Sequence, residues 1–310
     1  MARHLRYQST DWATHHVVSR CIQGFGFLKP CKQIVNVCTG VLGYSLNQYQ
    51  DSIKLHHYVF LSNHFHLLVS SKDTRSLDSF MCHFKSNLAR ELARIHDWHG
   101  SLWQSRYSSE EILDEDGLIE IFKYITENSV KEGLVNHPNQ WPGLHGYHQL
   151  VECRSVKGDW IDRTGLYLAS QRNKDVNPLE FITVYEISLD PPPLWDSLSK
   201  NEYQVLCAKL CKEAIQNARK KHSKGFLGVT QILKQPVYQT RFTKRSTRPL
   251  CRTKCIKRLK AYQAEYYEFK VLFQEASAVL RKSLCLGISE IQVFFPLGGI
   301  PLFGGYIASS

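Results

Sequence analysis

The chain of 310 residues carries a formal net charge of +11, and 43% of its residues are hydrophobic. This much apolar material can form a sizeable core, which excludes a disordered chain, a collagen and a small disulfide scaffold. Residues 1–150 hold 14 basic and 14 acidic side chains, whereas residues 151–310 hold 25 and 14. From Lys209 to Lys260 there are 16 basic residues and one acid. Such a concentration of charge indicates a surface that binds a phosphate backbone.

Neither end of the sequence predicts a membrane segment. The residues after Met1 lack the apolar region of a signal peptide, and the uncharged stretch Ile291–Ser310 contains prolines and glycines that disfavour a spanning helix. The ten cysteines include no CxxC pair. Cys207/Cys211 and Cys251/Cys255 come nearest to metal-ligand spacing, but no second pair or His-x3-His partner completes a zinc set, so we expect reduced, buried thiols. Together these features favour a cytoplasmic protein with no membrane partner.

The first elements in chain order are a strand, a helix and a hairpin. Mixed β-branched and polar residues predict a strand over 12–22. Apolar residues three and four apart predict a helix over 33–49, despite Gly40 and Gly43. Strands over 53–61 and 64–70 follow, joined by a turn at Ser62-Asn63.

A long helix comes next, over 76–96, with Ser76 as its expected N-cap. Residues 102–112 are predicted to be extended. The acidic run that begins at Asp114 favours a helix start, and this helix is expected to end at about Asn128. The order of these elements predicts an α+β fold, in which an antiparallel sheet has helices packed on it.

The second half divides into a connector and a basic extension. Residues 151–199 are weakly patterned and include three consecutive prolines, 191–193, which indicate a stiff connector. Residues 200–310 contain two expected helices, over 201–221 and 257–282, separated by a basic, proline-interrupted stretch. We therefore expect a first part over 1–150, a connector, and a mostly helical basic C-terminal extension.

The residues with the clearest chemistry are two histidines and a tyrosine. His64 and His66 alternate with Phe65 on a predicted strand, so both imidazoles face one side and can share an ion. Such a pair alone is more often two ordinary surface histidines. Tyr124 and Asn128 are neighbours at the edge of the apolar stripe of a helix, from which they can face the histidines. The alternative for Tyr124 is a boundary residue that packs its ring and exposes its hydroxyl.

Five landmarks in one order make residues 10–150 similar to a known family. They are Ser62–Val69 with its His-hydrophobe-His core, Phe84–Ser86, Gly100–Tyr107, Tyr124–Val135 and Trp141-Pro142. This succession resembles the REP-associated tyrosine transposases, a branch of the HUH superfamily of single-tyrosine endonucleases and transposases. A looser similarity to the C-terminal extension of longer members involves Gly225–Gly228, Lys244–Ser246 with Pro249, and Phe295-Pro296 with Gly298.

The resemblance implies a ferredoxin-like HUH catalytic domain over residues 1–150. It implies that His64 and His66 bind a divalent metal, Mg or Mn, and that Tyr124 is the nucleophile. Asn128 would complete the metal shell. The chain has Asn128-Ser129 where the family usually has Asn-Pro, which removes no ligand. The implied reaction is cleavage and rejoining of DNA through a 5′-phosphotyrosine, which needs no ATP because the bond energy is conserved.

The implied partner is single-stranded, hairpin-forming DNA, such as a repetitive extragenic palindrome, and a homodimer is compatible with the family. Aromatic side chains stack on unpaired bases and cations follow the backbone. The candidate DNA-binding residues are Lys85, Arg90, Arg106, Tyr107, Lys220, Lys221, Arg245, Arg248, Arg252 and Lys254. Any one of these cations taken alone is more often a solvated charge.

Two other functions remain open at this point. One is a domesticated hairpin-binding protein that has lost cleavage, and the presence of His64, His66 and Tyr124 argues against it. The other is a metal-dependent phosphodiesterase that uses water, with Tyr124 only packing. A covalent DNA adduct distinguishes the transposase from both.

Overall fold

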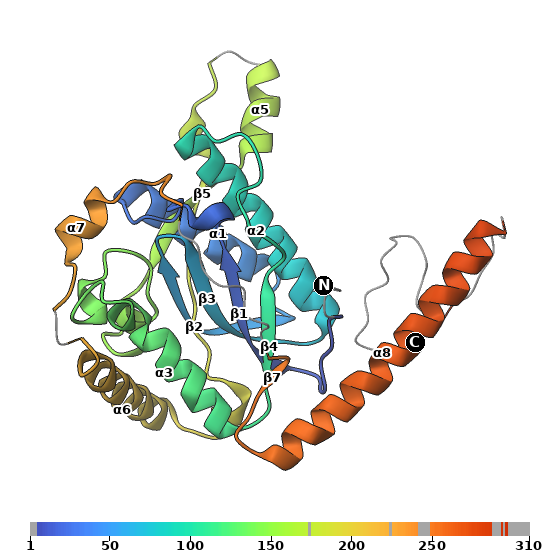
Figure 1. The fold of residues 1–310 in the computed structure, drawn as a ribbon. Helices are drawn as coiled ribbons and strands as arrows, with labels where there is room; N and C mark the ends of the chain where they lie inside the picture. Colours follow the sequence, from blue (N-terminus) through green and yellow to red (C-terminus); the bar gives the residue numbers. More distant parts are fainter. Residues whose placement is uncertain are drawn as a thin grey trace.

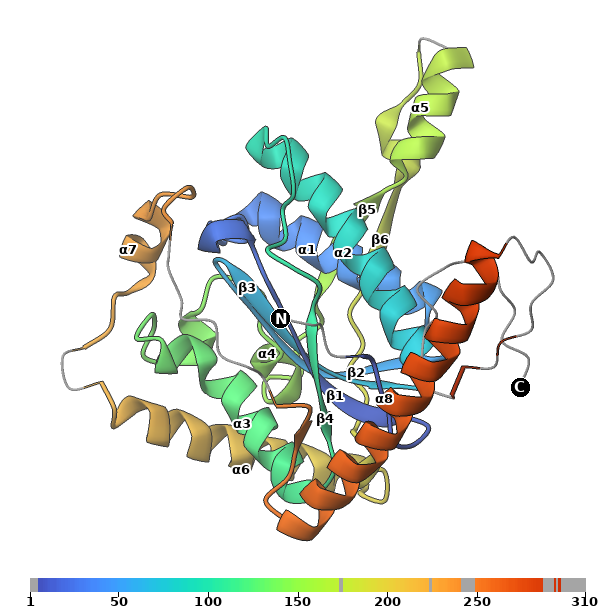
Figure 2. The same ribbon diagram turned by 45° about the vertical axis from the view of Figure 1, so that its right-hand side comes forward.

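The structure is a computed structural model that describes residues 5–172, 175–222, 225–240, 249–286, 293 and 295–296. It confirms the α+β class. A five-stranded sheet has the order β2-β3-β1-β4-β7, and helices cover both of its faces (Figures 1 and 2). The strands are β1 (Ala13–Arg20), β2 (Ile53–Leu61), β3 (His64–Ser71), β4 (Ser108–Ile112) and β7 (Cys251–Arg252). Strand β1 pairs antiparallel with β3 and β4, β2 pairs antiparallel with β3, and β7 joins β4 in parallel.

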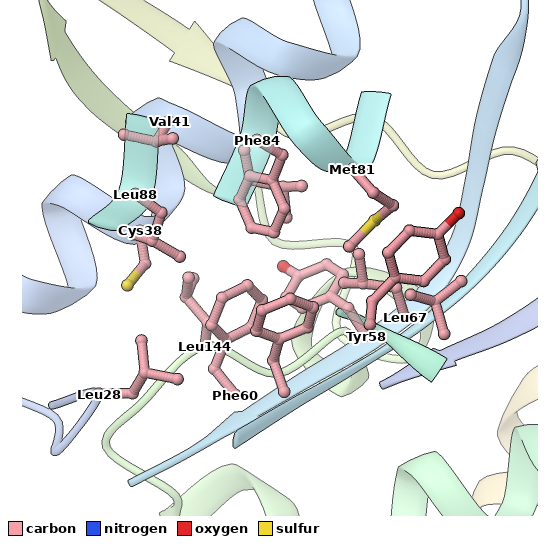
Figure 3. Close-up of a cluster of buried hydrophobic side chains, with 14 of the residues drawn as sticks. Leu28, Cys38, Val41, Tyr58, Phe60, Leu67, Met81, Phe84, Leu88 and Leu144 are labelled. Atoms are coloured by element: carbon pink, nitrogen blue, oxygen red, sulfur yellow. The ribbon is translucent and has the colours of Figure 1, made fainter. Parts of the chain in front are cut away.

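Helices α1 (Lys32–Gln48) and α2 (Thr74–His96) cover one face of the sheet. The close-up in Figure 3 shows Met81, Phe84 and Leu88 of α2 above Phe60 and Leu67 of the sheet. All five side chains are at most 3% exposed. Burying aromatic and aliphatic side chains of this size contributes about 1.5–3 kcal/mol each, so this layer is a main source of stability.

The opposite face is covered by α3 (Glu115–Lys131), α4 (Tyr147–Leu150) and α6 (Lys200–Arg219). Leu68 of β3 packs there with Phe122 and Ile125 of α3. Because side chains alternate along a strand, β3 sends Phe65 into the α1–α2 layer and the two histidines beside it toward α3. The predicted placement of His64 and His66 on one face, with Phe65 in the core, is confirmed.

The helix ends differ slightly from the sequence expectation. The N-cap of α2 is Asp73, whose carboxylate accepts a hydrogen bond from the Ser76 backbone N–H at 2.7 Å, so Ser76 as N-cap was wrong. Asp114 caps α3 in the same way, by accepting from Gly117 N–H at 2.8 Å. This helix continues three residues beyond the expected end at Asn128, to Lys131, because Ser129 can continue a helix that a proline would disturb.

Within the described residues, the second half also contains a two-stranded sheet and further helices. They are β5 (Lys157–Ile161), α5 (Arg163–Arg172), β6 (Ile182–Glu186), α7 (Val229–Lys234) and α8 (Ile256–Cys285), with short 3-10 turns at Ile22–Gly24, Pro138–Gln140, Pro178–Phe181 and Pro193–Trp195. The two helices expected in the extension are present as α6 and α8. The antiparallel β5–β6 sheet was not predicted, and it packs on α1.

The second half packs directly on the first. Helix α6 lies along α3, β7 extends the sheet beside β4, and α8 follows β7 as a long helix at the side of the molecule (Figure 1). The division of the chain at residues 150 and 199 stays a prediction. The described residues do not include the motif segment Lys244–Ser246, Gly298 or most of the C-terminal tail.

Gly40 of α1 allows the β5–β6 sheet to approach the helix backbone. A Cβ atom at this position would lie 2.0 Å from the carbonyl oxygen of Asp159 on β5. We therefore expect Gly40→Ala to lower the free energy of unfolding by about 1–3 kcal/mol through overpacking, although alanine is the better helix former. Urea denaturation followed by circular dichroism measures this change. The matched control is Asn47→Ala, an exposed site of the same helix, which should be near neutral; equal stability of the two variants would contradict the close packing.

All ten cysteines are free thiols, as expected. The expectation that they are buried holds for Cys21, Cys38, Cys207, Cys211 and Cys251, and it was wrong for the other five, which are exposed. Within the described part of the chain, no helix is both long enough and apolar enough to cross a membrane.

Candidate active site

A cleft lies between α3 and the sheet face that carries the histidines. Its cavity of about 570 Å³ is lined by His16, His66, Glu110 and Tyr124, and by Arg252 of β7 from the second half. The lining also includes Asp116, Ile119, Glu120, Ile121, Lys123, Glu127, Lys131, Pro249 and Lys254. Cations and carboxylates therefore surround a tyrosine and two histidines.

The sequence-predicted nucleophile and the two motif histidines come together in the structure. The ring centroids of Tyr124 and His66 are 5.4 Å apart, and those of His64 and His66 are 5.0 Å apart. Both pairs have edge-to-face geometry. Helix α3 positions Tyr124 because its buried stripe of Leu118, Ile121, Phe122 and Ile125 faces the sheet, which leaves the tyrosine at the edge of the cleft.

The hydrogen bonds of the histidines determine which ring nitrogen can bind a metal. Nδ1 of His64 lies 2.6 Å from Oδ1 of Asn63, which can only accept, so His64 Nδ1 carries the hydrogen. Nδ1 of His66 lies 2.9 Å from Nε2 of His16. In both residues Nδ1 is engaged in the protein, and Nε2 is the candidate ligating nitrogen. This arrangement is typical of metal-binding histidines, which bond through their second nitrogen to a neighbouring group.

Asn128 lies one turn after Tyr124 on α3 and is 1% exposed. Within the described residues, neither its side-chain oxygen nor its nitrogen has a hydrogen-bond partner. A buried amide group left without a partner costs about 1–3 kcal/mol. The chemistry of this amide oxygen suits a metal ligand. The described lining of the cleft does not include Asn128, so its role as the third ligand stays a prediction.

The donor set as a whole fits a divalent ion of intermediate softness. Two imidazole nitrogens and an amide oxygen suit Mn²⁺ and are compatible with Mg²⁺ completed by water and phosphate oxygens. Across the described residues there is no group of three or more His, Cys, Asp and Glu side chains that could hold an ion. The predicted ligand set of His64, His66 and Asn128 is not such a group, because its third member is an asparagine.

Two charged residues of α3 flank the tyrosine. The ammonium of Lys131 lies 4.2 Å from the centroid of the Tyr124 ring. Lys131 also pairs with Glu127 at 3.8 Å, and burial raises the pKa of Glu127 while Lys131 and Lys221 partly lower it. A cation over the ring stabilises negative charge that develops on the phenol, so Lys131 is placed to favour the phenolate.

Two of the predicted DNA-binding residues are internal. The Lys85 ammonium donates to the Ser105 carbonyl at 3.0 Å, and burial together with Arg6 lowers its pKa to about 8. The Tyr107 hydroxyl donates to Asp78, and the Arg6 guanidinium lies 3.7 Å above the Tyr107 ring. The expected exposed cation and stacking ring are corrected to buried groups that hold the Gly100–Tyr107 segment against α2.

The other candidates lie at the surface, apart from those that are not described. Arg90, Arg106, Lys220, Lys221 and Lys254 are exposed. Arg252 is one-third exposed, and it pairs with Glu110 at 3.0 Å and with Glu120 at 3.3 Å. This pairing reduces its availability for a phosphate. Arg245 and Arg248 lie outside the described residues.

Sequence reasoning missed His16 and Glu110. His16 is 6% exposed and Glu110 is 7% exposed, and the two are opposite each other in the β1–β4 ladder. Two adjacent carboxylates, Glu110 and Glu111, on a segment predicted to be extended were one available signal. The registers of β1 with β3 and β4 that bring the two residues to His66 are not readable from one strand alone.

Residues 36–128 match the family model described as "Transposase IS200 like". The matched segment contains His64, His66, Tyr124 and Asn128, and it confirms the resemblance to the single-tyrosine transposases that the motifs predict. This part of the chain is accordingly similar to the transposases that the model describes.

Among solved structures, the chain is similar to a REP-associated tyrosine transposase bound to a REP hairpin, with 19% identity and a TM-score of 0.37. That match covers 48% of this chain and 84% of that one. A protein from Deinococcus radiodurans R1 described as a transposase also matches, with 19% identity and a TM-score of 0.29, over 41% of this chain and 97% of that one. Both likenesses are too distant to assign a function. No curated protein sequence matches the chain.

Proposed function

We propose that this transposase cleaves and rejoins hairpin-forming single-stranded DNA through a 5′-phosphotyrosine at Tyr124. The observation that carries the proposal is the Tyr124 ring in the cleft, 5.4 Å from the ring of His66. The branch of REP-associated enzymes, the use of Mg or Mn, and a homodimer are parts of the same proposal that come from the sequence resemblance.

His64, His66 and Asn128 would hold the ion, which when bound acts as a Lewis acid on the scissile phosphate. The cleft orients the phosphate in line with the Tyr124 oxygen. The bond from this oxygen to phosphorus forms as the bond from phosphorus to the 3′ oxygen breaks. The phenol loses its proton and the departing 3′ oxygen gains one, so the products are a 5′-phosphotyrosine and a free 3′-OH.

Lys131 has a distinct part in this reaction. A tyrosine has an ordinary pKa near 10, so its oxygen must be made more nucleophilic at neutral pH. The Lys131 ammonium, 4.2 Å from the Tyr124 centroid, stabilises the charge that develops on the oxygen during attack. Rejoining is the reverse: a 3′-OH attacks the phosphotyrosine, and the same cation stabilises the departing phenolate.

A covalent trapping assay tests the proposal. The full chain is incubated with end-labelled hairpin single strands and Mn²⁺ or Mg²⁺, and the products are separated under denaturing conditions. A band in which DNA is covalently joined to protein supports the transposase. Free cleavage products without that band favour the phosphodiesterase, and tight binding without any cut strand favours the non-cleaving binding protein.

Three exposed cations of the second half make a second, independent prediction. Combined Lys220→Gln, Lys221→Gln and Lys254→Gln should weaken single-strand binding and reduce the slope of its salt dependence by about 0.7 for each phosphate that the variant no longer neutralises. Fluorescence anisotropy over a salt series measures both quantities. Lys32, an exposed lysine on α1 on the other face of the sheet, provides the matched control as Lys32→Gln. An unchanged slope in the triple variant would contradict the assignment of these three lysines to DNA binding.

A further inference from the structure

Three side chains connect the second half of the chain to His66. We propose that Arg252, Glu110 and His16 form a relay of positioning residues that fixes the ring orientation and tautomer of His66 as a metal ligand. This inference rests on the metal site of the proposed function. It assigns a role to two residues, His16 and Glu110, that the sequence motifs do not mark.

The contacts follow one line through the sheet. Nε2 of His16 lies 2.9 Å from Nδ1 of His66, and the two rings are stacked with centroids 5.1 Å apart. Nδ1 of His16 lies 3.5 Å from Oε2 of Glu110. Arg252 Nη2 then pairs with Oε1 of the same carboxylate at 3.0 Å. The line therefore begins on β7, crosses β4 and β1, and ends on β3.

The carboxylate sets the direction of every hydrogen bond in the relay. Paired with Arg252, Glu110 is ionised and can only accept, so His16 donates to it from Nδ1. His16 Nε2 must then accept, and the donor is Nδ1–H of His66. His66 is left with its lone pair on Nε2. The relay thereby selects the tautomer that a metal ligand at this position needs, which is the minor one for a free imidazole.

Burial makes this selection strong. His16, His66 and Glu110 are 6%, 3% and 7% exposed. Water competes little for their hydrogen bonds, and a carboxylate that accepts from an imidazole increases the basicity of the imidazole beyond it. Partners of this kind change metal affinity by about 10- to 100-fold when they are removed.

The opposite face of the same two strands provides matched controls. His15 is as buried as His16, and it bonds instead to Gln8 at 3.1 Å and Ser109 at 3.2 Å. Glu111 is buried beside Glu110 and accepts from Ser9 and Tyr262. Neither side chain faces His66, because both point to the other face of the sheet. Variants His15→Gln and Glu111→Gln therefore report what a polar change in β1 or β4 does without touching the relay.

The first measurement is Mn²⁺ binding to the full chain without DNA, by titration calorimetry. We expect His16→Gln to weaken binding by about 10- to 100-fold, Glu110→Gln to weaken it less, and both controls to stay within about twofold. The double variant should be no weaker than His16→Gln, because Glu110 acts through His16. Equal affinities in wild type and the relay variants would overturn the proposal, as would an equal loss in the controls.

The second measurement reads the tautomer directly and needs no metal. In ¹⁵N-labelled apo protein, long-range ¹H–¹⁵N correlations should show His16 and His66 protonated at Nδ1. Glu110→Gln should shift His66 toward protonation at Nε2, because an amide can donate as well as accept. A purely structural role for Glu110 would leave the tautomer unchanged. His66 found protonated at Nε2 in the wild type would overturn the relay.

Failure of the relay and failure of the proposed function give different results. If the wild type forms a covalent DNA adduct and His16→Gln binds Mn²⁺ as tightly as the wild type, the relay fails and the function stands. If no adduct forms while the relay variants lose Mn²⁺ affinity as expected, the function fails and the relay stands. If His16→Gln does not fold, Glu110→Gln and Arg252→Gln test the relay through its other two members.

Discussion

Replacing Tyr124 by phenylalanine is expected to reduce the formation of the covalent DNA adduct by about 10⁴-fold or more, because the variant has no nucleophilic oxygen. The ring remains and keeps its edge-to-face contacts with His16 and His66. Folding and DNA affinity should therefore be close to those of the wild type. Single-turnover trapping on a labelled hairpin strand measures the loss.

The control for this variant is Tyr147→Phe. Tyr147 lies on α4 in the same layer as α3, and its ring contacts His137 and His145 rather than the cleft histidines. It should form the adduct at a rate near that of the wild type. An adduct that persists in Tyr124→Phe would mean that another side chain attacks the phosphate.

Removing both motif histidines is the second large change. In His64→Ala with His66→Ala we expect Mn²⁺ affinity to fall by more than about 100-fold. The loss of a ligand lowers metal affinity more than the loss of a residue that hydrogen-bonds to a ligand, which lowers it about 10- to 100-fold. Adduct formation should fall with it, and chelation of divalent ions should reduce the wild type to the same level. Calorimetry gives the affinity, and the trapping assay gives the rate.

His83→Ala is the matched control for the histidine pair. His83 lies on α2 across the sheet, bonded to Ser45 at 3.1 Å, and it is remote from the cleft. It should bind Mn²⁺ as the wild type does. If His64→Ala with His66→Ala binds Mn²⁺ as tightly as His83→Ala, the ligand assignment is wrong.

A simple truncation cannot test the basic half of the chain. Ile215 and Leu210 of α6 are buried in the layer that holds α3, and Cys251 of β7 pairs with the sheet. Deleting residues 200–310 would uncover the helix that carries Tyr124. Charge substitutions at exposed lysines leave this packing in place, so they isolate the electrostatic contribution.

The first half of the fold was predictable because its signals are local. The β2 strand has the bounds expected from its composition, and the alternation in β3 correctly separated Phe65 from the two histidines. The two-stranded β5–β6 sheet was not predicted. Its residues are mostly half-buried or exposed, so they lack a strong alternating pattern, and it packs through backbone contacts such as that of Gly40 with Asp159.

The site was predictable only where a motif or one helical turn connects its members. Tyr124 and Asn128 share a helix face, and the two motif histidines share a strand face. His16 and Glu110 reach His66 through the registers of three strands, and Arg252 through a two-residue strand near the end of the basic stretch. Lys85 and Tyr107 were taken for surface residues because sequence does not show which side of a helix or loop a neighbouring segment covers.

In the proposed reaction, Tyr124 itself becomes joined to the 5′ end of cleaved DNA. The most direct measurement is mass spectrometry of the adduct after nuclease and protease digestion. We expect a nucleotide 5′-phosphate on the peptide that contains Tyr124, together with a free 3′-OH on the released strand. A nucleotide on any other residue, or a 3′-phosphate linkage, would contradict it.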